Sequence, residues 1–244
     1  EIHEKNKNTI KRAENYSYLF IFYDALGKRR EATIYLDKAI KSHTELGNEK
    51  EVLRYKMSKL LINQDILYGK DVLAELETYL IKAQTLNDVS LEFSVLRNIL
   101  YIHLSKKEFE KSEKYFRSFK DLLDTNLDIH RYTALLLDYH RMRGDFYFHQ
   151  NLYYKAQENY KEALRIARIR EAVWNEARVL NLLAQIDWKL DNKKLAKAQL
   201  DTAIYVGEKR KLNDLLVESY NIKYTFAEEE KDYKAVYLNS KKID

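Results

Sequence analysis

One short pattern, a small or aliphatic residue followed by a polar-rich amphipathic segment, returns along this chain at a spacing of about 40 residues. The marker residues are Ala32, Ser112, Ala156, Ala196 and Val236, whose positions differ by 80, 44, 40 and 40 in turn. The first gap, about twice as wide as the others, has room for one degenerate copy around the segment DVLAELETYLIKA. A unit of this length cannot bury its apolar face alone and must stack on its neighbours. The repeat therefore predicts a solenoid of similar units.

Helices are the expected element throughout. Apolar residues in NLYYKAQENYKEALRIA recur at the three- and four-residue spacing of one helix face. The chain has no proline, which would break helices, and its five glycines are too few for the tight turns of an all-β protein. We expect an all-α protein in which each copy is an antiparallel hairpin of two helices. Polar capping sequences such as LGNEKE, TLNDVS and KLNDLL mark the expected turns.

The segment from Arg141 resembles a tetratricopeptide repeat. That motif has a small residue, an aromatic, then alanine, aromatic and alanine at fixed places, and this segment fills them with Gly144, Tyr147, Ala156, Tyr160 and Ala163. The resemblance spans nearly the whole chain, although the closing proline is missing and the period exceeds the usual spacing of about 34 residues. It implies a right-handed superhelical solenoid of about six hairpins, forming one domain over residues 1–244. The approximate repeats are 10–47, 50–87, 90–127, 134–172, 175–211 and 214–244.

Catalytic and metal chemistry has little support. The absence of cysteine excludes disulfides, thiolate zinc sites and cysteine nucleophiles. No two of the six histidines lie three or four residues apart, and no phosphate-binding or nucleophile-elbow motif is present. An enzyme would have to use Asp145 and His149 as acid and base, with no nucleophile or oxyanion site beside them. We therefore expect a protein without enzymatic activity, metal or cofactor.

One group of polar residues forms a candidate site. Arg141, Asp145 and His149 follow one another at intervals of four, on the helix face that the resemblance implies lines a concave groove. With their counterparts in the neighbouring repeats, the expected groove consists of Arg97, Tyr101, Arg141, Asp145, His149, Arg178, Asn181, Gln185 and Trp188. We expect its arginines and asparagine to hold the backbone or a carboxylate of a peptide, while Tyr101, Phe148 and Trp188 supply the apolar anchor. An exposed ion-pair ladder is the alternative, and both interpretations stay open.

The leading functional hypothesis is a scaffold that binds a protein or peptide. Repeats of this length are similar to those of bacterial signalling proteins, which implies the sensory or docking part of a signal-transduction or transcription regulator. The alternative is a nucleic-acid-associated regulator that binds through basic helix ends. The 43 basic and 38 acidic side chains are interspersed and sum to only +5, a weak electrostatic footprint, so nucleic acid is not the expected partner.

Neither end of the sequence determines the compartment of the protein or the domains beside it. The longest apolar stretch, from Tyr16 to Leu26, is far shorter than the ~18 residues that a membrane span needs. The chain opens at Glu1 and closes inside a helical pattern, so we expect an excised or processed fragment. Its compartment is unknown, and could be the cytoplasm or, after removal of a signal, the periplasm. Because Val236 and Tyr237 lie on a final helix without a successor, we expect that end to dimerise or to continue into a fused effector domain.

Overall fold

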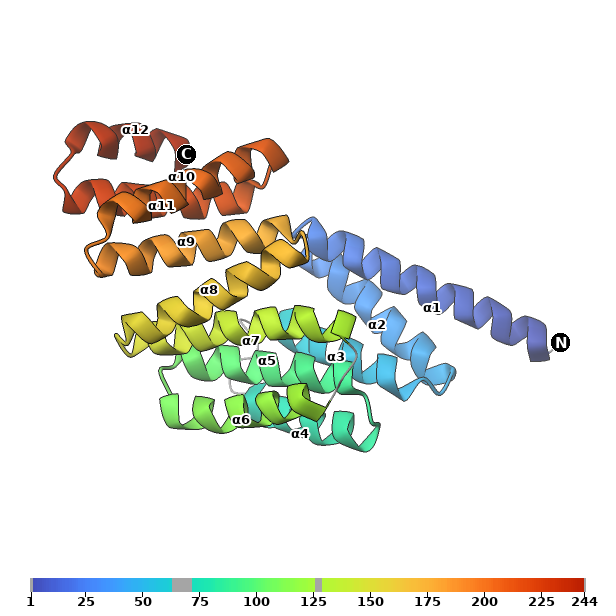
Figure 1. Ribbon diagram of the computed structural model, residues 1–244. Helices are drawn as coiled ribbons and strands as arrows, with labels where there is room; N and C mark the ends of the chain where they lie inside the picture. Colours follow the sequence, from blue (N-terminus) through green and yellow to red (C-terminus); the bar gives the residue numbers. More distant parts are fainter. Residues whose placement is uncertain (1, 63–71, 126–128, 244) are drawn as a thin grey trace. The chain divides into compact units, whose positions relative to one another are not determined.

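A computed structural model describes residues 2–62, 72–125 and 129–243 (Figure 1). These residues form twelve helices and no strand, which confirms the all-α prediction. The helices are α1 (Ile2–Ala25), α2 (Arg29–Glu45), α3 (Glu49–Ile62), α4 (Val72–Thr85), α5 (Val89–Ser105), α6 (Phe109–Thr125), α7 (Ile129–His149), α8 (Tyr153–Ile169), α9 (Val173–Lys189), α10 (Lys193–Arg210), α11 (Asn213–Glu229) and α12 (Tyr233–Ile243). None of them is long and apolar enough to cross a membrane within the described ranges.

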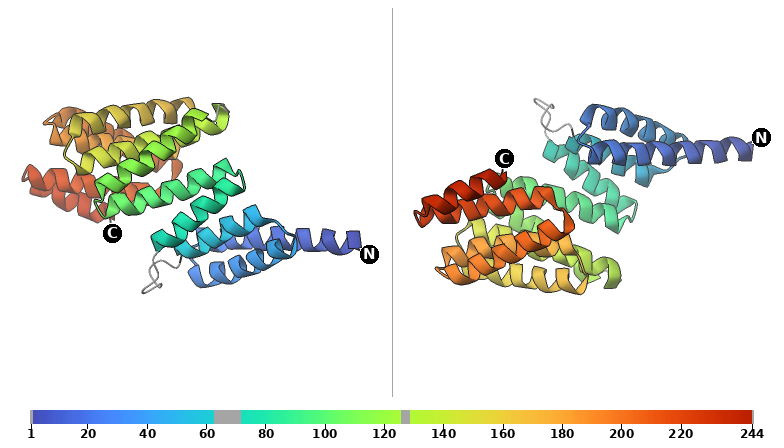
Figure 2. Two further views of the ribbon diagram at one scale, coloured as in Figure 1. Left: turned by 90° about the horizontal axis from the view of Figure 1, so that it is seen from below. Right: turned by 90° about the horizontal axis from the view of Figure 1, so that it is seen from above.

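The chain divides into two compact units, Glu1–Ile102 and His103–Asp244. In the first unit α1 packs on α2, α2 on α3, and α3 on α4 (Figure 2). In the second, α7 pairs with α8, α9 with α10, and α11 with α12, while α9 also contacts α8 and α11. Successive helices therefore form antiparallel hairpins inside each unit, as the repeat predicts. A single continuous solenoid over residues 1–244 stays a prediction.

The segment expected to hold the degenerate copy forms α4, in which Leu76 and Ala83 are fully buried. The repeat markers lie where helices touch: Ala156 and Ala196 have no exposed surface. Gly144 of α7 shows how close the contact is, because a Cβ on it would lie 2.3 Å from the Tyr160 ring on α8. Small residues thus let the two helices of a hairpin approach, and Tyr160 also packs in one buried cluster with Val179 and Leu183 of the next hairpin.

The turns depend on backbone conformation more than on side-chain caps. Each turn that the structure describes between consecutive helices contains one residue with positive φ, between 49° and 69°. These residues are Gly27, Gly47, Asn87, Lys107, Asn151, Glu171, Asp191, Lys211 and Lys231. The following N–H then bonds back into the helix just ended, as from Ala172 to the Ala167 carbonyl at 2.9 Å.

Side-chain capping was expected more widely than it occurs. In TLNDVS the prediction holds, because the Asp88 carboxylate accepts the Leu91 N–H at 3.0 Å. In KLNDLL it is wrong, because the N-cap of α11 is Leu212, which has no side chain able to accept a hydrogen bond. The residues before α8 and α9 are also apolar and make no side-chain cap. The left-handed residue therefore marks a turn here more reliably than a capping side chain.

The last helix leaves apolar surface exposed. Tyr233 and Tyr237 of α12 are 77% and 57% exposed, and Val236 is half-buried. Dimerisation or a following domain at this end stays a prediction.

Candidate functional site

The first part of the candidate site is a fixed ion pair on α7. The Arg141 guanidinium lies 3.0 Å from Asp145 Oδ2, one helical turn away. The other carboxylate oxygen, Oδ1, accepts a hydrogen bond of 2.6 Å from the hydroxyl of Tyr160 on α8. Burial, followed by the charge of Asp145, raises the pKa of Tyr160 well above its usual value, so the hydroxyl stays protonated and keeps donating. Asp145 is thus held from two sides while both it and Arg141 remain partly accessible.

The second part lies on α9, where Arg178 carries a positive charge without an ion-pair partner among the described residues. Its guanidinium carbon is 5.1 Å from the centroid of the Trp174 ring, in the range of a cation–π contact. Its Nε is buried and makes no hydrogen bond to any part of the chain that the structure describes. The guanidinium is therefore positioned by an aromatic ring and left with unused donors.

The third part is Glu218 on α11. Burial raises the pKa of its carboxyl group, and the charges of Arg178, Asp145 and Arg141 all act on it. Glu218 nevertheless forms no ion pair or hydrogen bond with any residue that the structure describes. We call Arg141, Asp145, Arg178 and Glu218 the charge cluster. It joins α7, α9 and α11, the first helices of three neighbouring hairpins.

Two expected groove residues are inside the protein. Asn181 has no exposed surface, and its Oδ1 accepts a 3.0 Å hydrogen bond from Ser219 of α11, so it joins two helices. Trp188 is 5% exposed and stacks on Phe226 with ring centroids 3.9 Å apart. Its indole N–H donates to Glu229 at 2.6 Å. The assignment of Trp188 as an apolar anchor is corrected, because Phe226 and Glu229 already occupy both its face and its polar edge.

The remaining predicted residues are Gln185, His149, Arg97 and Tyr101. Gln185 is half-buried, and its side-chain amide reaches only the Asn181 carbonyl at 3.5 Å. His149 is exposed in the last turn of α7 and makes no hydrogen bond to Asp145 among the described residues. Arg97 and Tyr101 are exposed on α5 and belong to the first unit. Their participation in one groove with the charge cluster stays a prediction.

Two residues of the site were missed in the sequence. Trp174 is 44% exposed in the first turn of α9, one turn before Arg178. Glu218 follows Arg178 after one full repeat, so the repeat itself places it on the same face of the next hairpin. A search at intervals of one helical turn and one full repeat from Arg178 would have found both.

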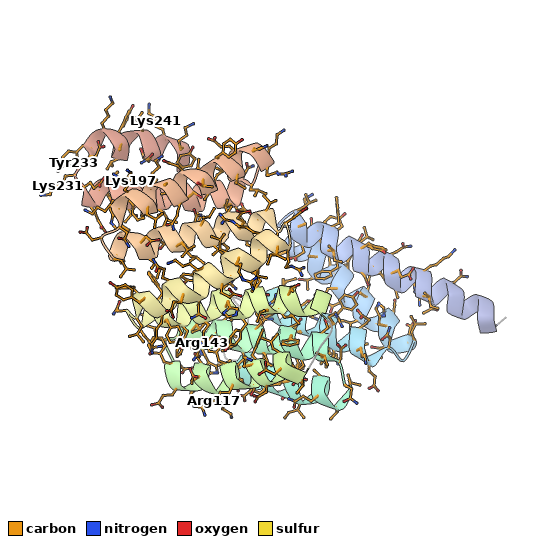
Figure 3. The ribbon with its side chains drawn as sticks, viewed as in Figure 1. Arg117, Arg143, Lys197, Lys231, Tyr233 and Lys241 are labelled. Atoms are coloured by element: carbon orange, nitrogen blue, oxygen red, sulfur yellow. The ribbon has the colours of Figure 1, made fainter. Side chains whose placement is uncertain are left out.

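A neighbouring arginine differs from those of the charge cluster. Arg143, labelled in Figure 3, binds Glu113 of α6 through two hydrogen bonds of 2.5 and 3.1 Å. Its guanidinium also lies about 4.8–4.9 Å from the ring centroids of Phe116, Phe146 and Tyr147. Arg143 thus stabilises the packing of α6 on α7, and its donors are used. No group of histidine and carboxylate ligands suitable for a metal ion occurs in the described ranges.

Stacked helical hairpins with small residues at their contacts define a helical-repeat protein. Residues 138–169, the greater part of the α7–α8 hairpin, match the family model of the tetratricopeptide repeat. The resemblance expected from the sequence is therefore confirmed.

Solved structures show the same fold at low sequence identity. The chain is similar to NprR in complex with its cognate peptide NprX, with 16% identity, 95% of this chain and 66% of that chain covered, and a TM-score of 0.70. It is also similar to BtubC (BKLC) from P. vanneervenii, with 17% identity, 70% of each chain covered and a TM-score of 0.59. This chain thus spans just under two thirds of the NprR chain. A comparison with curated proteins gave no match.

Proposed function

We propose that the chain is a non-enzymatic scaffold that binds a protein or peptide segment across α7, α9 and α11. The observation that carries this proposal is the pair Arg178 and Glu218. They lie on adjacent helices, each is within electrostatic range of the other, and neither forms an ion pair with a described residue. A charged group that is partly removed from water and left unpaired is costly, and a ligand that supplies its partner recovers that cost.

The two charges favour an extended ligand with both kinds of polar group. Arg178 offers fixed donors for a carboxylate or a backbone carbonyl. Glu218 accepts from a backbone N–H or a basic side chain. Trp174 adds a partly exposed apolar surface beside Arg178, and aromatic and arginine side chains are the usual anchors of binding sites.

The Arg141–Asp145 pair has a different role in this proposal. Because Tyr160 fixes Asp145 and Asp145 fixes Arg141, the pair forms a rigid border to the cluster. Such a site needs little reordering when the ligand arrives, which lowers the entropic cost of binding. The ion-pair ladder and the binding groove are therefore compatible on this helix.

We further propose that the scaffold is the sensory or docking part of a bacterial regulator. Support comes from the fold shared with NprR, whose structure contains its cognate peptide. Because identity is only 16%, this support concerns the fold, and the peptide of that protein is not assigned to this chain.

Panning of a phage-displayed random peptide library on the purified chain tests the proposal. Selected peptides are then titrated by fluorescence polarisation against wild type and against Arg178→Ala, Glu218→Ala and Trp174→Ala. We expect a loss of roughly tenfold or more in affinity for each variant, as for residues at the centre of an interface. Lys209→Glu, an exposed change on α10, is the matched control and should bind as wild type does. Unchanged binding by a folded Arg178→Ala/Glu218→Ala double variant would refute the site.

A further inference from the structure

A buried carboxylate on α9 connects helices α8, α9 and α10. Asp187 of α9 has no exposed surface and no cationic partner among the described residues. Its Oδ1 accepts hydrogen bonds from Gln157 Nε2 at 2.7 Å and Asn192 Nδ2 at 3.3 Å. Its Oδ2 accepts from Gln199 Nε2 at 2.9 Å. Three amide donors from α8, the turn and α10 thus surround one planar group with two oxygen atoms.

The same place in the last hairpin is identified by the repeat. Helices α8 and α10, α9 and α11, and α10 and α12 each begin one full repeat, about 40 residues, apart. The counterparts of Gln157, Asp187, Asn192 and Gln199 are therefore Lys197, Ala227, Asp232 and Asn239. Alanine replaces the carboxylate at the centre, while residues with polar side chains remain at the other three positions.

A cleft lies where the carboxylate is missing. Lys197, Ala227, Asp232 and Asn239 all line it, its volume is about 160 Å³, and Leu200 and Phe226 contribute apolar walls. Figure 3 shows Lys197 on α10 beside α12, the helix that carries Tyr233 and Lys241. Asn239 is only 7% exposed, and its Nδ2 is buried without a hydrogen-bond partner in the part of the chain that the structure describes. A buried amide donor without an acceptor from the protein needs one from solvent or from a ligand.

The charges around the cleft decide what that group is. Lys197 binds Glu230 at 2.7 and 2.9 Å, and Lys223 binds Asp201 at 2.7 Å, so each lysine already has a carboxylate partner. Asp232 accepts the Ala235 N–H at 3.0 Å but has no lysine partner within the described ranges. The missing group must accept a hydrogen bond from Asn239, and Asp232 favours a donor and repels a second anion.

We propose that this cleft binds a primary carboxamide, such as the side-chain end of glutamine or asparagine or a small free amide. Its carbonyl oxygen accepts from Asn239, and its NH₂ group donates to Asp232. The carboxamide has the planar shape of the Asp187 carboxylate and carries no charge. This site is separate from the charge cluster and does not depend on the proposed function of that cluster.

Nuclear magnetic resonance on the whole chain tests the proposal. We expect titration with acetamide to give a saturable shift of the Asn239 side-chain amide signals at millimolar concentration, with acetate at least tenfold weaker. Ala227→Asn, which places a carboxamide in the cleft, should abolish the acetamide response and raise Tm, whereas Ala198→Asn on the exposed face of α10 should leave the response unchanged. Asn239→Ala removes the donor, so the backbone amide of Ala227 should then no longer respond to acetamide.

Three results would overturn the assignment: no saturable shift, an unchanged response in Ala227→Asn or Asn239→Ala, or acetate binding as well as acetamide. Two further probes identify the source of the carboxamide. Free L-glutamine binding more tightly than acetamide would support a small-molecule site. An acetyl-Gly-Gln-Gly N-methylamide peptide binding more tightly would support a glutamine side chain of a partner segment.

Discussion

The contact between Gly144 and Tyr160 gives the sharpest quantitative prediction. In Gly144→Ala the new Cβ would lie 2.3, 2.4 and 2.9 Å from three atoms of the Tyr160 ring. The two shortest of these distances are more than about 1 Å below the ~3.5–4.0 Å optimum for carbon atoms. The ring cannot easily yield, because it is 1% exposed and its hydroxyl is bound to Asp145. Overpacking costs about 1–3 kcal/mol, and the higher helix propensity of alanine offsets about 1 kcal/mol. The difference is a net loss of about 0–2 kcal/mol in the free energy of unfolding, and we expect the upper end of about 2 kcal/mol because the buried ring is held in place.

Urea unfolding followed by far-ultraviolet circular dichroism measures this loss. Gly207→Ala is a matched control in α10: its Cβ would meet Leu216 at 2.8 and 3.0 Å, near the end of a flexible side chain that can rotate away. The control should lose less stability or gain some. Gly144→Ala combined with Tyr160→Leu should show favourable coupling in a double-mutant cycle, because the smaller side chain removes the clash. A Gly144→Ala variant as stable as wild type would refute the argument.

Three further predictions concern packing, turns and pH. Ala196→Leu should lower the free energy of unfolding by about 1–3 kcal/mol in thermal or urea melts, because its site is fully buried; an unchanged melt would contradict the packing register. Glu171→Gly should raise the free energy of unfolding by up to about 1 kcal/mol, because φ there is +52° and glycine adopts positive φ without strain. Gly47→Ala, at φ +69°, should lower it for the same reason. If both substitutions changed stability in the same direction, strain in the turns would not be the cause. The raised pKa of Tyr160 stabilises the folded chain below the unfolded tyrosine pKa near 10, and this contribution is lost as pH rises toward the higher folded value. Between about pH 9 and 11 the free energy of unfolding should therefore fall more for wild type than for Tyr160→Phe. Equal falls for the two proteins in urea unfolding at these pH values would contradict the prediction.

The sequence was sufficient to predict the fold because packing contacts repeat. One repeat after Gly144, Ala156 and Tyr160 the chain has Ala184, Ala196 and Leu200, so small residues recur where helices touch and a large buried side chain recurs between them. The face of α7 that carries Arg141 and Asp145 was also predictable, because helical spacing alone groups them.

The accessibility of individual site residues was not predictable in this way. The separation of Trp174 and Trp188 in the sequence is close to four helical turns, so periodicity places them on nearly the same side of α9. Only the next hairpin distinguishes them: Phe226 of α11 covers Trp188, while Trp174 stays partly exposed. Asn181 is concealed for the same reason, by its bond to Ser219. Such covering depends on long-range packing that one helix does not encode.

The regular turns have a consequence for how the array can change in length. The left-handed residues at 151, 171, 191, 211 and 231 are evenly spaced. The unit that repeats with constant length is therefore one helix together with its turn, which is half of a hairpin. Helix α7 departs from this rule, with 21 residues where α8, α9 and α11 have 17 each. The difference of four is close to one helical turn of about 3.6 residues, so the added length rotates the helix by only about 40°. An insertion of half a turn, about two residues, would instead rotate it by about 200° and expose the packing face. Natural length variation in such an array should therefore occur in whole turns or in whole modules of one helix and its turn.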